Sequence, residues 1–129
     1  MKLASVILSA LVIVAASTLP SFAQTDLIPE WSRYDNLAQQ AAKKGDYDTA
    51  IMYYQKARQV AAENSDPVLR QCFIFGAEAR EAGAQAAREY LRTHGRNRAA
   101  LAQASRIQQA AFREAANRLF VGGYENGCP

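Results

Sequence analysis

Histidine is nearly absent from this chain, and its scarcity restricts the chemistry that the chain can carry out. His94 is the only histidine among the 129 residues. A metal site built from several histidines is therefore excluded, and a Ser-His-Asp triad has one candidate, which lies beside Gly95 like an ordinary surface residue. The chain also lacks a phosphate-binding loop, a dinucleotide-binding fingerprint and a Cys-x-x-Cys pair.

Paired catalytic carboxylates are lacking as well. Glu78, Glu81 and Glu89 are scattered among Arg80 and Arg88, a pattern typical of solvated ion pairs on helices and not of two carboxylates isolated in a cleft. We therefore expect no enzyme, no cofactor and no metal. An enzyme of unknown type is the alternative, and it rests only on the lone histidine and these carboxylates.

The sequence has no apolar run long enough to span a membrane. The run from Leu3 to Ala16 is shorter than the ~20 apolar residues that a spanning helix needs, and Pro20 interrupts the segment soon afterwards. It follows Lys2 and ends at Ser21-Phe22-Ala23, a small-residue pattern that a signal peptidase accepts. We predict a cleavable signal peptide over residues 1–23 and a periplasmic or secreted protein that does not span the membrane; an uncleaved anchor is the alternative.

Cysteine is rare and the net charge is small. Cys72 and Cys128 are the two cysteines, and in an oxidising compartment one bridge could hold the tail 122–129 to the body. The alternative is a buried Cys72 and a free Cys128 thiol. Without Lys2, fourteen Lys and Arg stand against twelve Asp and Glu, so we expect no nucleic-acid partner.

Strand signals are missing after residue 23, where Ala, Gln, Arg and Glu, all good helix formers, dominate. Glycines supply helix stops, whereas Asp and Asn supply helix caps and Pro67 suits a first helical position. The stops are Gly45, Gly83 and Gly95, and the caps are Asp46, Asp66 and Asn97. We predict five helices, over residues 29–44, 47–63, 67–82, 84–93 and 98–120.

One stretch of the chain has a specific pattern of small and aromatic residues. On its first helix these are Tyr34, Leu37 and Ala38; after the turn 44–48 they are Ala50, Ile51, Tyr53, Tyr54 and Ala57. This pattern resembles a tetratricopeptide repeat (TPR), in which small residues let two helices approach and aromatic residues fill the gap beside them. The resemblance covers residues 31–64, and a degenerate second copy is expected over 67–95.

The resemblance implies an all-α fold of antiparallel helical hairpins, stacked as a short TPR-like superhelix. Such repeats usually need about three units to bury their faces, so the long C-terminal helix is expected to close the stack as a cap, unless a second subunit does so. We expect a signal peptide over 1–23, one helical domain over 24–121 and a tail over 122–129.

The first helices of successive repeats line a concave groove in the TPR family, and peptides lie in it. By resemblance, the expected partner-binding residues are Asn36, Gln39, Lys43, Arg70, Phe73 and Arg80. Asn36, Lys43 and Arg70 could hold a peptide carboxylate, although Asp35 stands where carboxylate-binding members have a lysine. A solvated helix face would show the same residues.

A basic patch follows near the fourth expected helix. Arg88, Arg92, Arg96 and Arg98 fall within eleven residues and are opposed there only by Glu89. The patch could engage an acidic protein surface, anionic lipid heads or a phosphate, but cations at a helix C-terminus also stabilise the helix dipole. We predict an exported protein-protein interaction module; the alternative is a structural subunit that self-associates in a larger assembly.

Overall fold

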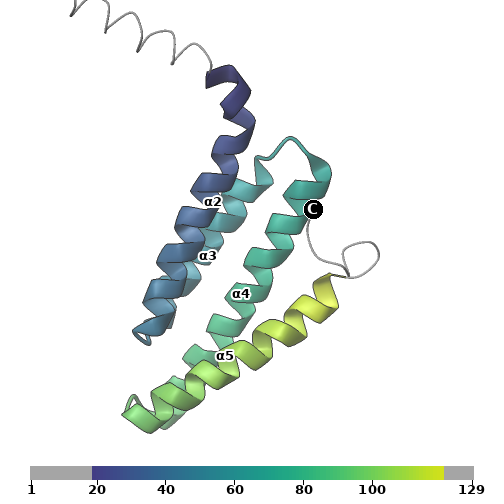
Figure 1. Ribbon diagram of the computed structural model, residues 1–129. Helices are drawn as coiled ribbons and strands as arrows, with labels where there is room; N and C mark the ends of the chain where they lie inside the picture. Colours follow the sequence, from purple (N-terminus) through teal and green to yellow (C-terminus); the bar gives the residue numbers. More distant parts are fainter. Residues whose placement is uncertain (1–18, 121–129) are drawn as a thin grey trace, which may run out of the picture.

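A computed structural model describes the backbone of residues 19–120 and the side chains of residues 29–120. Four helices make up this part of the chain: α2 (Leu19–Lys43), α3 (Tyr47–Ala62), α4 (Pro67–His94) and α5 (Arg98–Leu119). Successive helices alternate in direction and pack on their neighbours in the chain (Figure 1). The predicted all-α fold class is confirmed for the described residues.

The turn between α2 and α3 forms as its residues predict. Gly45 has a positive φ of 77°, a conformation that glycine adopts without the steric cost of a Cβ. Its N–H donates to the Ala42 carbonyl over 2.9 Å, and the N–H of Asp46 donates to the Ala41 carbonyl over 2.9 Å. The Asp46 carboxylate then accepts a hydrogen bond from the Thr49 N–H and caps α3.

The other two turns are also set by capping residues. Asp66 accepts hydrogen bonds from the N–H groups of Val68 and Leu69, with Pro67 in the first turn of α4. Asn97 accepts from the Ala100 N–H over 2.8 Å at the start of α5. These predicted helix starts are confirmed.

The predicted start of the first helix is wrong. We expected it near Pro29, but α2 begins at Leu19 and Pro29 lies inside the helix. Proline lacks an N–H and crowds the preceding turn, yet a helix can continue through it with a kink. Most of the predicted signal peptide and the whole tail 122–129 lie outside the described residues.

The predicted helix break at Gly83 is also wrong, because α4 runs without interruption from Pro67 to His94. A Cβ on Gly83 would lie 2.6 Å from the carbonyl oxygen of Gln108 and 3.3 Å from Cβ of Phe112. Glycine here lets the backbones of α4 and α5 approach closely. The helical hairpin expected over residues 67–95 therefore does not form; one long helix occupies that stretch.

The core is built mainly from alanine, which permits close helix packing. Its largest members are Tyr47, Ile51, Tyr54 and Leu91. Tyr54 is 2 % exposed and Ala38, Ala50 and Ala57 are fully buried, as the pattern of residues 34–57 predicts. None of the helices within residues 19–120 is both long and apolar enough to cross a bilayer.

Candidate functional site

A groove opens between α2 and α5, with α3 and α4 behind it. Its volume is about 450 Å³. The lining residues are Gln39, Ala42 and Lys43 from α2, Tyr54 from α3, Arg80 from α4, and Ser105, Gln108, Gln109 and Phe112 from α5. Below we call this the α2–α5 groove.

The two walls of this groove are joined at the end near the α2–α3 turn. Arg96, in the connection between α4 and α5, donates to the Gly45 carbonyl oxygen over 2.8 Å. Leu101 of α5 lies so close to Gly45 that a Cβ added to Gly45 would be 2.6 Å from Cδ2 of Leu101. From this junction α2 and α5 diverge on either side of α4 (Figure 1).

Side-chain amides and one aromatic ring dominate the walls of the α2–α5 groove. Gln39 faces it from α2, and Gln108 and Gln109 face it from α5. Each amide can donate and accept hydrogen bonds, as a peptide backbone does. Phe112 adds an apolar contact, so the walls suit an extended polypeptide segment.

Arg80 lies at the base of the groove between two aromatic rings. Its guanidinium carbon is 5.6 Å from the centre of the Trp31 ring and 5.5 Å from that of Phe112, within the range of cation–π attraction. Its Nε lies 3.2 Å from Oδ1 of Asp35, and Nη1 donates to the Gly76 carbonyl over 3.3 Å. The side chain is held in place yet is 31 % exposed.

Asp35 lies behind Arg80 and is 7 % exposed. Its Oδ2 accepts a hydrogen bond of 2.6 Å from the Gln39 amide, whereas Oδ1 accepts none from the described residues and is only ion-paired with Arg80. Burial raises the pKa of the Asp35 carboxyl above its usual value, and attraction to Arg80 and the Gln39 hydrogen bond offset this effect in part. Asp35 is thus a buried carboxylate that is incompletely satisfied.

Tyr54 closes the groove from α3. Burial is the main reason that the pKa of its phenol is raised to about 12, with a further contribution from Asp35. The phenol is therefore neutral throughout the physiological range. Lys43 stands at the rim, is exposed, and has no ion-pair partner among the described residues.

Three of the six predicted partner-binding residues, Gln39, Lys43 and Arg80, line the α2–α5 groove. Asn36 is exposed on α2 but does not line it. Arg70 donates to the Asn64 carbonyl over 3.1 Å at the α3–α4 turn. Phe73 packs on Trp31 with ring centres 4.9 Å apart. The structure thus does not gather Arg70 and Phe73 with the other predicted residues in this groove.

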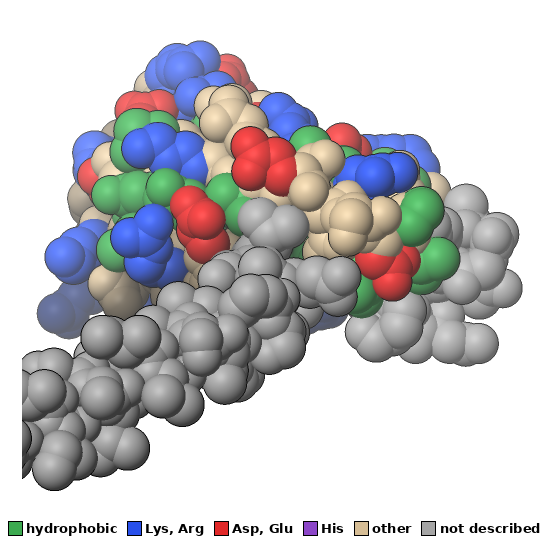
Figure 2. Space-filling model, turned by 90° about the horizontal axis from the view of Figure 1, so that it is seen from above, with side chains coloured by type: hydrophobic (Ala, Val, Ile, Leu, Met, Phe, Trp, Pro, Cys, Tyr) green, Lys and Arg blue, Asp and Glu red, His purple; other side chains and the backbone are tan. Residues whose placement is uncertain are grey.

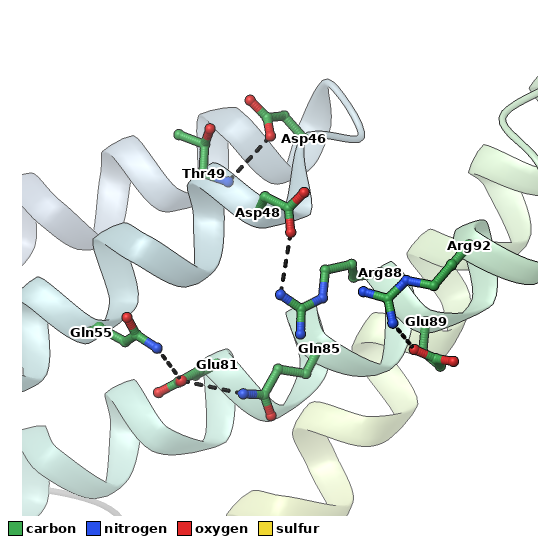
Figure 3. Close-up of polar contacts among 9 residues, drawn as sticks. All are labelled: Asp46, Asp48, Thr49, Gln55, Glu81, Gln85, Arg88, Glu89 and Arg92. Carbon is green, nitrogen blue, oxygen red and sulfur yellow. Dashed lines mark hydrogen bonds and ion pairs between the residues drawn. The ribbon is translucent and has the colours of Figure 1, made fainter.

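Three arginines of the predicted basic patch, Arg88, Arg92 and Arg96, line one hollow near the α2–α3 turn together with Asp46 and Asp48. Each of the three also makes a local contact, two of which are drawn in Figure 3. Arg88 pairs with Asp48 over 3.2 Å, and Arg92 pairs with Glu89 over 2.8 Å. Arg96 is bound to the Gly45 carbonyl, which leaves Arg98 exposed in the first turn of α5. No local pattern in the sequence indicates that Asp48 reaches Arg88 from forty residues away in the chain.

A second polar network joins α3 to α4. Glu81, 7 % exposed, accepts hydrogen bonds from the amides of Gln55 and Gln85 (Figure 3). Arg58 adds an ion pair to it over 3.2 Å. A buried carboxylate needs such partners, so we assign this network to the packing of the two helices.

Charges of both signs are mixed on the face seen in Figure 2. Lys and Arg side chains lie among Asp and Glu side chains, with hydrophobic side chains in small areas between them. That face therefore offers no extended area of one charge. The α2–α5 groove differs, because Lys43 and Arg80 are the charged residues of its lining and no carboxylate lines it.

The remaining predictions concern the two cysteines and metal binding. Cys72 is fully buried on α4, and Cys128 lies outside the described residues, so the bridge stays a prediction. The described residues contain no group of three or more His, Cys, Asp or Glu side chains able to hold a metal ion. Comparison of the chain with protein-family models, curated protein sequences and solved structures gave no match.

Proposed function

We propose that this protein is an exported, periplasmic or secreted, interaction module that binds an extended segment of another protein in the α2–α5 groove. Export is supported by the signal-like pattern of residues 1–23. Binding is supported by the chemistry of the groove, whose walls present amides to a peptide backbone and one aromatic ring to an apolar side chain.

The arrangement of amides from both walls around Phe112 is the observation that carries this proposal. Gln39 and Gln108 belong to helices far apart in the sequence, yet both reach the same groove. A groove of about 450 Å³ falls within the range of roughly 300–1,000 Å³ that is typical of ligand sites. The TPR resemblance of residues 31–64 agrees with a groove on α2, although the second wall here is α5.

Binding should depend on Phe112 and Lys43. In an array of immobilised capped peptides, we expect the best binders to lose about tenfold or more in affinity when Phe112→Ala removes the apolar contact, a loss of about 1.4 kcal/mol. Lys43→Glu should reverse the charge at the rim and weaken the acidic peptides selectively. Fluorescence anisotropy of the labelled binders gives the affinities.

Phe75→Ala is the matched control for this experiment. Phe75 is also a half-buried aromatic residue, but it packs against Phe120 with ring centres 5.8 Å apart and does not line the groove. Its truncation should leave peptide affinity unchanged. Equal losses in the two truncated proteins, with both still helical, would mean that peptides do not bind in the α2–α5 groove.

A self-associating structural subunit could pair through the face of α2 and α3 that carries Tyr34 and Tyr53. Tyr34 and Tyr53 stack there with ring centres 6.1 Å apart. Arg33 and Lys56 lie over these rings, so two identical faces would bring like charges together, which opposes pairing. These charges oppose self-association through that face, and we expect a monomer in sedimentation at micromolar concentration.

A further inference from the structure

On the premise of the function proposed above, we propose that Arg80 receives an acidic side chain of the bound peptide and that Asp35 takes up a proton when it does. The groove would therefore bind acidic segments more tightly as the pH falls. Four features of the structure lead to this proposal: the accessibility of Arg80, its unused donors, the burial of Asp35 and the charges around them.

Arg80 is both fixed and accessible. The Trp31 and Phe112 rings flank its guanidinium at 5.6 and 5.5 Å, which limits the entropy lost when a ligand binds. Its side chain is nevertheless 31 % exposed and lines the α2–α5 groove. An incoming anion would therefore meet a preorganised cation.

The guanidinium also keeps unused donors. Of its five N–H groups, one on Nη1 donates to the Gly76 carbonyl. Nε lies 3.2 Å from Oδ1 of Asp35 without a hydrogen bond to it, and Nη2 has no partner among the described residues. A carboxylate in the groove can bind end-on to the Nη1 and Nη2 groups, in the bidentate geometry that arginine favours. The ligand thus does not need to displace Asp35 to reach Arg80.

Two carboxylates would then share one guanidinium. Asp35 is 7 % exposed, and only Oδ2 has a hydrogen bond from the described residues. A second negative charge a few ångströms away makes ionised Asp35 more costly, as in other paired carboxylates. Burial already raises the pKa of Asp35 in the free protein, and the bound ligand raises that pKa further.

The charged and titratable groups around Arg80 leave Asp35 as the group that responds. From α2, the basic side chain of Lys43 also lines the groove. From α3, Tyr54 stays neutral because its pKa is about 12. Among the groove-lining residues of α5, Ser105, Gln108, Gln109 and Phe112, none carries a charge.

The sign of the pH effect follows from this proton uptake. Because the pKa of Asp35 is higher in the complex than in the free protein, affinity increases as the pH falls through the bound-state pKa. The affinity becomes constant below the pKa that Asp35 has in the free protein. One linked proton permits at most about a tenfold change in affinity for each pH unit, and we expect about tenfold in total between pH 7 and pH 5.

The test uses two capped octapeptides, equal except at one position, on the full mature protein. One carries cysteic acid, whose sulfonate stays ionised over this pH range, and the other carries glutamine. Isothermal titration at pH 5, 6 and 7 gives their affinities. In the wild-type protein, the sulfonate peptide should bind about tenfold more tightly at pH 5 than at pH 7, and the glutamine peptide should bind equally at both.

Two variants and one direct measurement complete the test. Asp35→Asn should bind the sulfonate peptide more tightly than the wild type does at pH 7, with no pH dependence. Arg80→Gln should lose the preference for the sulfonate. In the unmodified protein, the carbon-13 signal of the Asp35 carboxyl, followed by NMR against pH, should titrate at higher pH when the sulfonate peptide is present.

The outcomes separate this inference from the proposed function. If both peptides bind with affinities that do not change between pH 5 and pH 7, the groove function stands and the linkage to Asp35 is wrong. The linkage is also wrong if Asp35→Asn keeps the wild-type pH dependence, or if the NMR titration of Asp35 is unchanged by the peptide. Absence of binding by either peptide would contradict both proposals.

Discussion

Replacing Tyr54 with alanine should lower the free energy of unfolding by about 3–5 kcal/mol, as truncation of large core residues does. Tyr54 is 2 % exposed and belongs to the hydrophobic core between the helices. Removing its ring leaves a hole in a core cluster that consists mainly of alanine, whose short side chains cannot fill it. Thermal unfolding followed by circular dichroism should show a midpoint lower by more than about 10 °C.

Two controls isolate this packing effect. Tyr54→Phe keeps the ring and should change stability by less than about 1 kcal/mol, because no described residue hydrogen-bonds the hydroxyl. Tyr53→Ala removes a half-exposed ring of the same size and should cost clearly less than Tyr54→Ala. Equal effects of the two alanine variants would show that Tyr54 is not a core residue.

Gly83→Ala should destabilise the protein by about 1–2 kcal/mol, although alanine is normally better than glycine in a helix by about 1 kcal/mol. The new Cβ would lie 2.6 Å from the Gln108 carbonyl oxygen. This oxygen belongs to the backbone of α5, so it cannot move away by a side-chain rotation. Helix α5 would have to move away from α4. Because Gln108 and Phe112 line the α2–α5 groove, peptide affinity should fall as well.

Gly76→Ala provides the matched control in the same helix. The nearest atom to its new Cβ would be Nη1 of Arg80 at 3.2 Å, at the end of a flexible side chain. Stability should therefore stay the same or increase by up to about 1 kcal/mol. Urea unfolding of both variants gives the comparison, and a stabilised Gly83→Ala protein would show that α4 and α5 do not approach at this residue.

Local signals in the sequence were enough to predict the turns. Asp46, Asp66 and Asn97 each accept hydrogen bonds from the first turn of the helix they precede, and Gly45 adopts the left-handed conformation expected at a helix end. These contacts involve residues two to three apart. Short-range patterns of this kind determine local structure without reference to the rest of the fold.

Gly83 shows why the middle of the chain was predicted incorrectly. A glycine in a helical pattern indicates either a helix end or a close approach of another backbone. Its φ does not lie in the left-handed range, and its role depends on Gln108, twenty-five residues later. Nothing near Gly83 in the sequence distinguishes the two cases.

The candidate site was predicted only in part for the same reason. The TPR resemblance predicted Gln39, Lys43 and Arg80 as groove residues, and these three line the α2–α5 groove. The second wall was missed because α5 was expected only to close the stack as a cap, whereas Ser105, Gln108, Gln109 and Phe112 of α5 line the groove. The burial of Asp35 also depends on Arg80, a contact across 45 residues that local patterns do not show.

The most direct test of the groove is NMR mapping of a bound peptide on the isotopically labelled protein. Titration with the sulfonate octapeptide should shift the side-chain amide signals of Gln39, Gln108 and Gln109, the ring signals of Phe112 and the Nε–H signal of Arg80. The Gln55 and Gln85 amides, which bind Glu81 outside the groove, should not move. Shifts confined to Gln55, Gln85 or the Tyr34–Tyr53 face, with the groove amides unchanged, would contradict the proposed binding site.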